Sequence, residues 1–207
     1  FSQSFTMKGV LYLMDGKTYR AVRKSSKNTA WEAVSVSGTA YVPTTTISAA
    51  PTGGGTSYEA VNLLTPKRIN TFIGDGTATQ FKVDATDLDE TAVTAEVNGS
   101  AVTVSAVNRS TGLVTLAAAP ANGNGLANVS IAFAKTVSGH ADKINKCRFA
   151  GLYGGKNDTR VFLSGNPDEP DCDWQSGLYD PTYFPDTGYT RMGTDASAIV
   201  GYLKQYE

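Results

Sequence analysis

Closely spaced turn signals constrain this chain more than any other feature of its sequence. Asn98-Gly99 separates two alternating segments, Ala92–Val97 and Ala101–Val107. This arrangement is the strongest short-range signal of a β-hairpin. Two more alternating segments follow, Leu113–Leu116 and Ala127–Ala134, and the second places Val129, Ile131 and Phe133 on one face. Short strands with a turn about every 8 to 12 residues predict a small β-sandwich.

The flanking segments have a different sequence pattern, but this pattern also predicts strands and turns. We expect one strand pair in each flank: Met7–Met14 with Thr18–Arg23 around Asp15-Gly16, and Lys146–Tyr153 with Thr159–Ser164. Near the C-terminus, Ala196–Tyr206 fits either a helix or a buried strand. The fold is therefore predicted to be all-β. A β-sandwich at residues 70–136 is inserted into a β-rich scaffold formed by residues 1–69 and 137–207.

Charge and composition limit the classes of function that this chain can have. The 207 residues include 18 Lys and Arg against 19 Asp and Glu, a net charge of −1, so there is no basic excess of the kind that nucleic-acid binding uses. We expect no specific nucleic-acid binding. Apolar runs are too short for a membrane helix, so no membrane insertion is expected. The chain starts at Phe1 and stops directly after an apolar segment, which suggests a piece of a longer polypeptide.

Reactive side chains are few. Cys147 and Cys172 are 25 positions apart and form no CxxC motif, which gives no support to a zinc or redox site. A single disulfide stays open, although two thiols fit a protein made in a reducing cytosol better. His140 is the only histidine, and no GxSxG motif accompanies it. The sequence therefore predicts a protein that is not an enzyme and holds no cofactor.

An acidic run is the only candidate for a metal. Four carboxylates lie within six residues, and they are weak candidate ligands for a structural calcium ion: Asp168, Glu169, Asp171 and Asp173. The run lacks the glycine and the closing glutamate of an EF-hand loop. A solvated acidic loop is the preferred interpretation, so we expect no metal.

A proline-rich segment provides the candidates for partner binding. Four prolines, at positions 167, 170, 181 and 185, predict a long surface loop. The aromatic residues of this segment are Trp174, Tyr179, Tyr183, Phe184 and Tyr189. Exposed, these rings would stack on sugars or pack against a partner. Folded back, they would form a lid over the scaffold, which is preferred for a single chain. In an assembly both interpretations hold, because neighbouring subunits bury such loops.

Two stretches carry a resemblance to a known group of proteins. One is Tyr41–Arg68, with Pro-Thr-Gly-Gly-Gly-Thr-Ser-Tyr-Glu at 51–59, and the other is Gly154–Pro167, continuing to Asp180–Pro185. Both resemble structural proteins of tailed bacteriophages and prophages. The nearest group is the tail-nozzle or tail-hub proteins, which stabilise the portal channel of short-tailed phages and are built on β-propellers. Gly-Asp-Gly-Thr at 74–77 and Thr-Gly-Leu-Val-Thr at 111–115 resemble small immunoglobulin-like modules of phage tails.

This resemblance implies a role in assembly. It implies a scaffold that is part of a propeller, in which the two flanks supply about two of at least four blades. The function implied is a non-enzymatic structural component of a tail, located in the virion after assembly in the bacterial host cytoplasm. Its partners would be other copies of the chain and neighbouring tail or portal proteins. The alternative is a carbohydrate- or host-surface-binding module, with a host-surface glycan as partner.

Overall fold

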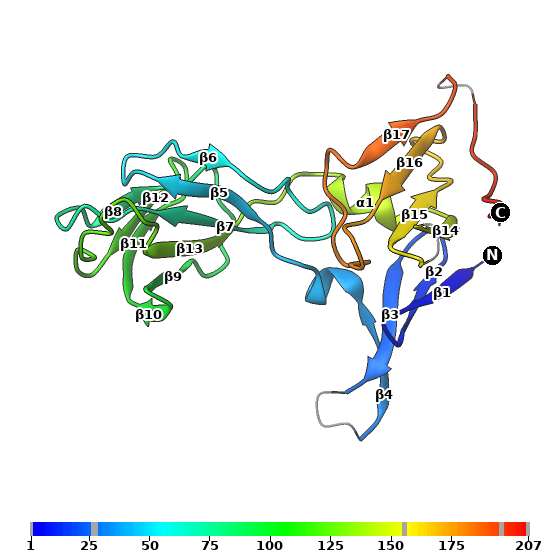
Figure 1. Ribbon diagram of the computed structural model, residues 1–207, viewed down its shortest axis with the longest axis horizontal. Coiled ribbons are helices and arrows are strands. Elements are labelled where there is room, and N and C mark those ends of the chain that lie inside the picture. The colour runs from blue at the N-terminus through cyan, green and yellow to red at the C-terminus, as the bar shows by residue number, and fades with distance from the viewer. Residues whose placement is uncertain (1, 26–28, 155–156, 195–196, 206–207) are drawn as a thin grey trace. The chain divides into compact units, whose positions relative to one another are not determined.

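The computed structural model describes residues 2–25, 29–154, 157–194 and 197–205, and nearly all of its elements are β-strands (Figure 1). The predicted all-β class is therefore confirmed. The chain divides into two compact units. The first unit contains residues 1–41, 62–65 and 138–207, and the second contains residues 42–61 and 66–137. In the described part of the chain, no helix is long and apolar enough to cross a membrane.

The first unit begins with a four-stranded antiparallel sheet in sequential order: β1 (Gln3–Met7), β2 (Val10–Met14), β3 (Tyr19–Lys24) and β4 (Trp31–Ser35). A short 3₁₀ helix, η1 (Val36–Thr39), follows. The prediction of one strand over Met7–Met14 is wrong, because the chain reverses at Lys8-Gly9. Both residues have positive φ, 50° and 75°, as a tight hairpin turn requires. The predicted turn at Asp15-Gly16 joins β2 to β3, and Asp15 accepts hydrogen bonds from the amides of Lys17 and Thr18.

A second four-stranded antiparallel sheet completes the first unit: β14 (Phe149–Tyr153), β15 (Arg160–Ser164), β16 (Cys172–Gln175) and β17 (Tyr189–Arg191). A short helix, α1 (His140–Asn145), precedes it. Strand β16 lies inside the segment predicted to be a surface loop, so that prediction is wrong over these four residues. Cys172 and Trp174 alternate into the core, and this burial outweighs the surrounding prolines.

Aromatic rings form the centre of the first unit. Phe5, Tyr12 and Tyr19 stack in a row, with centroids 5.1 Å and 5.7 Å apart between successive rings. Phe184 meets Tyr19 edge to face at 6.2 Å. The short segment around Asn62 joins this core, since Asn62 Oδ1 accepts a hydrogen bond from the Phe184 amide. These residues come from both ends of the chain and from its middle, so the unit closes only when all three segments meet.

The second unit has two sheets that share one hydrophobic cluster, as the two sheets of a β-sandwich do. The six-stranded sheet has the order β10 (Ser100–Val102), β9 (Thr94–Val97), β13 (Val129–Ala134), β7 (Lys67–Phe72), β5 (Thr44–Ala49) and β6 (Thr56–Ser57). The three-stranded sheet has the order β11 (Val104–Asn108), β12 (Leu113–Leu116) and β8 (Gln80–Lys82). The predicted buried face of Val129, Ile131 and Phe133 is confirmed.

The unit boundaries differ from the predicted ones at the N-terminal joint. The second unit starts at Val42 rather than Asn70, and residues 62–65 return to the first unit. The reason is strand pairing, since β7 pairs with β13 from Lys67 opposite Ala134 to Phe72 opposite Val129. The predicted single strand Ala101–Val107 is also divided. Its two halves, β10 and β11, belong to different sheets.

A carboxylate ties the segments of the second unit together. Asp84 Oδ2 accepts hydrogen bonds from the hydroxyls of Thr45 and Thr46, at 2.6 Å and 2.7 Å. The Asn70 side chain adds a third bond at 2.9 Å, and its oxygen accepts the Asp84 amide. Asn70 and both threonines are buried. Because buried polar groups are costly unless they are hydrogen-bonded, Asp84 satisfies polar side chains of two strands that are separated in sequence.

Candidate interaction site

The acidic run of the first unit is neutralised by side chains rather than open to a metal. Lys146 Nζ lies 2.7 Å from Asp168, and Lys143 Nζ lies 3.3 Å from Glu169. Arg191 reaches both Glu169, at 3.3 Å, and Asp171, at 2.7 Å. Among the residues that the structure describes, no group of three or more His, Cys, Asp or Glu side chains is arranged to hold a metal ion.

Asp173, the fourth acidic candidate, is separated from the other three. It lies on the opposite face of β16 from Cys172 and Trp174, and its Oδ1 accepts a hydrogen bond of 2.6 Å from the Tyr202 hydroxyl. Burial raises the pKa of the Asp173 carboxyl, and the Tyr202 bond opposes that rise. Burial, with the bond to Asp173 as the next cause, raises the pKa of the Tyr202 phenol well above its ordinary value. The pair therefore stays hydrogen-bonded rather than fully solvated.

The five aromatic candidates do not form one exposed patch. Trp174 and Phe184 are fully buried in the first unit's core. Tyr183 is half-buried, and its ring centroid lies 5.2 Å from that of Tyr41. Of the five, only Tyr179 and Tyr189 are exposed. Tyr179 lies in the loop after β16, and Tyr189 lies in β17. The lid interpretation therefore describes Trp174 and Phe184, and a sugar cannot stack on the Trp174 ring in this fold.

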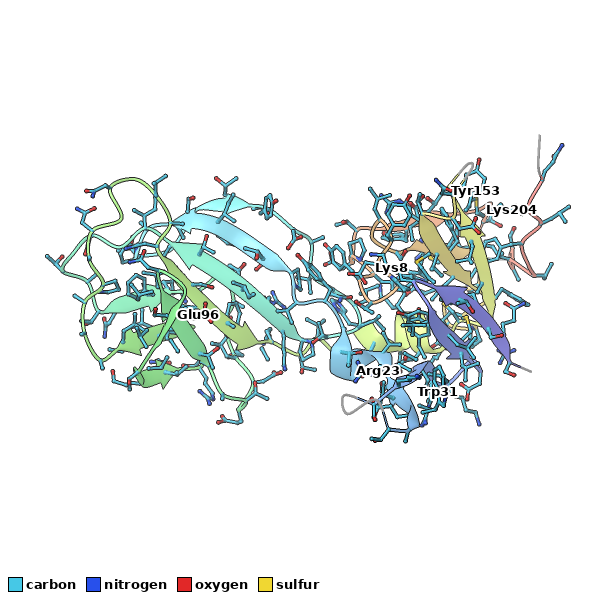
Figure 2. All side chains as sticks on the ribbon, turned by 60° about the horizontal axis from the view of Figure 1, so that its bottom comes forward. Lys8, Arg23, Trp31, Glu96, Tyr153 and Lys204 are labelled. Carbon is cyan, nitrogen blue, oxygen red and sulfur yellow. The ribbon has the colours of Figure 1, made fainter. Side chains whose placement is uncertain are left out.

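A groove lies on the outer face of the second sheet of the first unit. We define this outer-face groove by its central residues Gly151, Phe162 and Asp173, one from each of β14, β15 and β16. About 570 Å³ of open space remains between this face and residues 202–204, which form one of its walls. Tyr153, which Figure 2 places close to Lys204, lines one end of it. The groove combines apolar walls with two carboxylates, those of Asp158 and Asp173, which is the composition of a site with a few orienting polar groups.

The chain's own C-terminal segment crosses this groove. We call residues 199–204 the C-terminal strap; it belongs to the red end of the ribbon in Figure 1. Tyr202 lies directly over Gly151, where an added Cβ would come within 2.9 Å of Tyr202 Cγ. A glycine inside a strand thus marks the close approach of another segment. The segment Ala196–Tyr206 was predicted to be a helix or a buried strand, but residues 197–205 form neither.

Both cysteines are buried thiols in the core of the first unit, and neither lines the groove. Cys147 Sγ donates to the Lys143 carbonyl, and Cys172 Sγ lies 3.3 Å from the Glu169 carboxylate. Burial raises the pKa of Cys147 strongly, and burial together with Glu169 raises the pKa of Cys172 to about 11. Such thiols are poor nucleophiles, because the thiolate is the reactive form. Their place in the core makes them packing residues.

A second exposed feature is the hairpin formed by β3 and β4. Trp31 is 68% exposed and lies opposite Lys24, whose Nζ is 5.9 Å from its ring centroid. Arg23 and Glu32 form an ion pair at 3.0 Å on the other face of the same hairpin. Figure 2 shows Arg23 and Trp31 together at this edge of the sheet. An exposed tryptophan beside a lysine is a feature of recognition surfaces.

Sequence reasoning missed the residues that define the groove. Gly151 and Asp158 lie far in the chain from Tyr202 and Lys204, and only the fold brings the two pairs together. One signal was available, because a glycine inside a predicted strand suggests close backbone approach. His140, the only histidine, begins helix α1 and lies outside the groove. Comparisons with protein-family models, with curated proteins and with solved structures found no match for this chain.

Proposed function

We propose that this chain is a non-enzymatic structural component of a phage or prophage tail, a nozzle or hub subunit. It would act in the virion, after assembly in the host cytoplasm. It would pack against other copies of itself and against neighbouring tail or portal proteins. The resemblance of Tyr41–Arg68 and of the segment from Gly154 onward to such proteins motivates this proposal.

The sheet organisation of the first unit is the observation that carries the proposal. It contains two four-stranded antiparallel meanders, β1 to β4 and β14 to β17. The blades of a β-propeller are four-stranded sheets, and a closed ring needs at least four of them. The two sheets meet where Gln3 accepts a hydrogen bond from the Ala150 amide, at 2.6 Å. Strands β4 and β17 remain as outer edges, and edges of this kind pair with other chains unless they are covered.

Exposed apolar side chains support assembly through the same unit. Trp31, next to the β4 edge, is 68% exposed, and Leu178, in the loop after β16, is 62% exposed. Tyr179 is also exposed, and Lys8 Nζ lies 5.8 Å from its ring. Large apolar side chains at rotationally related positions are the usual contacts of a cyclic oligomer. Their burial between subunits would account for their exposure in a single chain.

The test is whether the full-length gene product enters particles. We expect it to form oligomers in size-exclusion chromatography with light scattering, and to co-purify with tail or portal proteins from lysates of induced cells. Trp31→Ala should weaken this association, whereas Tyr58→Ala, a change to an exposed tyrosine of the second unit, should leave it unchanged. A gene product that stays monomeric and never accompanies particles would refute the proposal.

The alternative is a carbohydrate- or host-surface-binding module, and its test depends on which aromatic rings are exposed. Trp174→Ala removes a buried core residue, so a loss of binding would report misfolding. Tyr189→Ala and Tyr153→Ala change exposed rings instead. A glycan array that shows binding abolished by either of these changes would support the alternative. An array without signal favours assembly.

A further inference from the structure

The C-terminal strap is held on the outer-face groove by a few polar contacts. The Ile199 amide donates to the Pro170 carbonyl at 3.0 Å. The Tyr202 hydroxyl donates to Asp173 at 2.6 Å, and Lys204 forms an ion pair with Asp158. The Tyr202 ring adds a packing contact, because it lies over Gly151. The described part of the strap is neither helix nor strand, so no backbone ladder ties it to the sheet.

The strap also carries two apolar side chains that are largely exposed. Val200 is 80% exposed and Leu203 is 97% exposed. A strap whose only role was to close its own groove would gain nothing from apolar residues at these positions. Scattered apolar residues on a surface are ordinary, but two of them within four residues, on a segment held by a few side chains, indicate a second contact surface.

We propose that the C-terminal strap is exchanged between copies of this chain, so that the strap of one copy lies across the outer-face groove of another. The structure itself identifies the occupant, because within one chain Tyr202 already packs over Gly151 and bonds to Asp173, and Lys204 pairs with Asp158. Every contact made inside one chain can be made between two identical chains, which is why exchange of an element is a low-cost route to association. This inference rests on the proposed assembly function and names the site through which copies would join.

Each contact that positions the strap is also a specificity element for exchange. Gly151 leaves room for one aromatic ring, Asp173 accepts one hydroxyl, and Asp158 pairs with one cation. A segment with Tyr and Lys two positions apart satisfies all three, as Tyr202 and Lys204 do. In an assembly, neighbouring copies are held at a high effective concentration, which lets exchange compete with closure within one chain.

A charge exchange tests the proposal with the full chain. Asp158→Lys places a lysine opposite Lys204, and Lys204→Asp places an aspartate opposite Asp158, so each variant repels its own strap. Mixed together, the two variants offer matched pairs only between chains, in both directions. We expect a 1:1 complex with twice the mass of one chain, bound about tenfold more tightly than either variant binds itself, because two mismatched pairs become two matched pairs.

Control variants test whether the C-terminal strap makes the contact between the two chains. The double variant, with both changes in one chain, should behave like the original protein. Tyr202→Ala in the Lys204→Asp chain should weaken the complex, because only one of the two straps keeps its ring, whereas Tyr58→Ala, a change to an exposed tyrosine of the second unit, should not. If a swapped charge prevents folding, Asp158→Cys mixed with Lys204→Cys under mild oxidation gives the second measurement, a disulfide between chains. Complexes no tighter than self-association, or no disulfide between folded chains, would overturn strap exchange.

These results are separable from the test of the proposed function. A protein that enters particles but shows no strap exchange assembles through other surfaces, which refutes the inference and leaves the proposed function standing. Exchange without entry into particles refutes the tail role and supports the exchange.

Discussion

The two compact units are both built from short strands, but they stabilise these strands with different side chains. The first unit contains both cysteines, both tryptophans and the only histidine, and its core is a row of stacked rings from Phe5 to Tyr19. The second unit has none of these residue types and relies on the cluster around Phe72 and Phe81. The difference shows that the features suited to partner contact, the groove, the strap and the β3–β4 hairpin, all belong to the first unit.

The units also treat acidic residues differently. In the first unit, cations neutralise Asp168, Glu169 and Asp171 in a partly exposed cluster. In the second unit, Asp84 accepts only neutral donors and joins strands through them. Exposed ion pairs contribute little to stability, whereas hydrogen bonds from buried donors to a carboxylate contribute more. The second unit should therefore depend on Asp84 more than the first depends on its ion pairs.

The largest expected effect tests whether the two cores are independent. Phe72→Ala and Phe184→Ala each remove a fully buried ring and should cost about 3–5 kcal/mol in the free energy of unfolding of their own unit. Both tryptophans belong to the first unit, so tryptophan fluorescence in urea reports that unit alone. Phe184→Ala should lower the fluorescence midpoint. Phe72→Ala should leave it in place and lower the midpoint seen by circular dichroism.

One result would show that the two units do not unfold independently. If Phe72→Ala moves the fluorescence midpoint as far as Phe184→Ala does, the chain unfolds as a single cooperative system. The two units would then be one thermodynamic domain, despite their separate hydrophobic clusters.

The next effect tests the carboxylate of the second unit. Asp84→Ala removes three hydrogen bonds, which should cost about 1–3 kcal/mol. Thr45 and Asn70 keep bonds to the Ile69 carbonyl, whereas the buried Thr46 hydroxyl loses its carboxylate acceptor. The matched control is Asp87→Asn, since asparagine tolerates the positive φ of 51° at this position, the Asp87 side chain is 74% exposed and its ion pair with Lys135 is 3.9 Å long. This control should change the stability by less than about 0.5 kcal/mol. Equal effects of the two changes would mean that Asp84 does not hold the strands together.

Local features of this fold could be predicted from the sequence, and contacts between distant segments could not. Asn98-Gly99 fixes its own hairpin through two positive φ angles, 50° and 75°, so no other part of the chain is needed. The buried face of β13 follows from alternation alone. The Lys8-Gly9 turn was missed because lysine is not a characteristic residue at a position with positive φ.

Pairing across the sequence decided the rest. Strand β7 joins the second unit because it pairs with β13, which lies about sixty residues further along the chain, and no local pattern in Lys67–Phe72 indicates this partner. The groove follows the same rule, since Tyr202 meets Asp173 across 29 positions. Within Cys172–Gln175 the alternation was readable, but four surrounding prolines favoured a loop. Burial of Trp174 outweighed them.

A pH-dependent effect tests the buried carboxyl of the first unit. Burial raises the pKa of Asp173 in the folded chain, so the native state binds this proton more tightly than the unfolded state does. The contribution of Asp173 to stability is therefore greatest below the ordinary carboxyl pKa, and it falls as the pH rises through the raised value. Asp173→Asn does not titrate and keeps an acceptor for the Tyr202 hydroxyl.

The measurement is the free energy of unfolding by urea from pH 4 to pH 8, for both proteins. We expect the Asp173→Asn variant to gain stability relative to the original protein as the pH rises. A relative gain of the original protein over the same range would mean that the Tyr202 hydrogen bond stabilises the charged form more than burial opposes it. Asp173 belongs to the first unit, so the fluorescence signal of that unit should report the whole difference between the two proteins.

The smallest expected effect separates recognition from packing within the first unit. Trp31 is 68% exposed and contacts Lys24, so Trp31→Ala should change the stability by less than about 0.5 kcal/mol. It should remove the red-shifted part of the fluorescence emission and leave the emission of the buried Trp174. Trp174→Ala, the matched change in the core, should cost about 3–5 kcal/mol. A Trp31→Ala cost above about 2 kcal/mol would show that Trp31 packs within its own chain, because a residue kept for a partner contributes to association and not to folding.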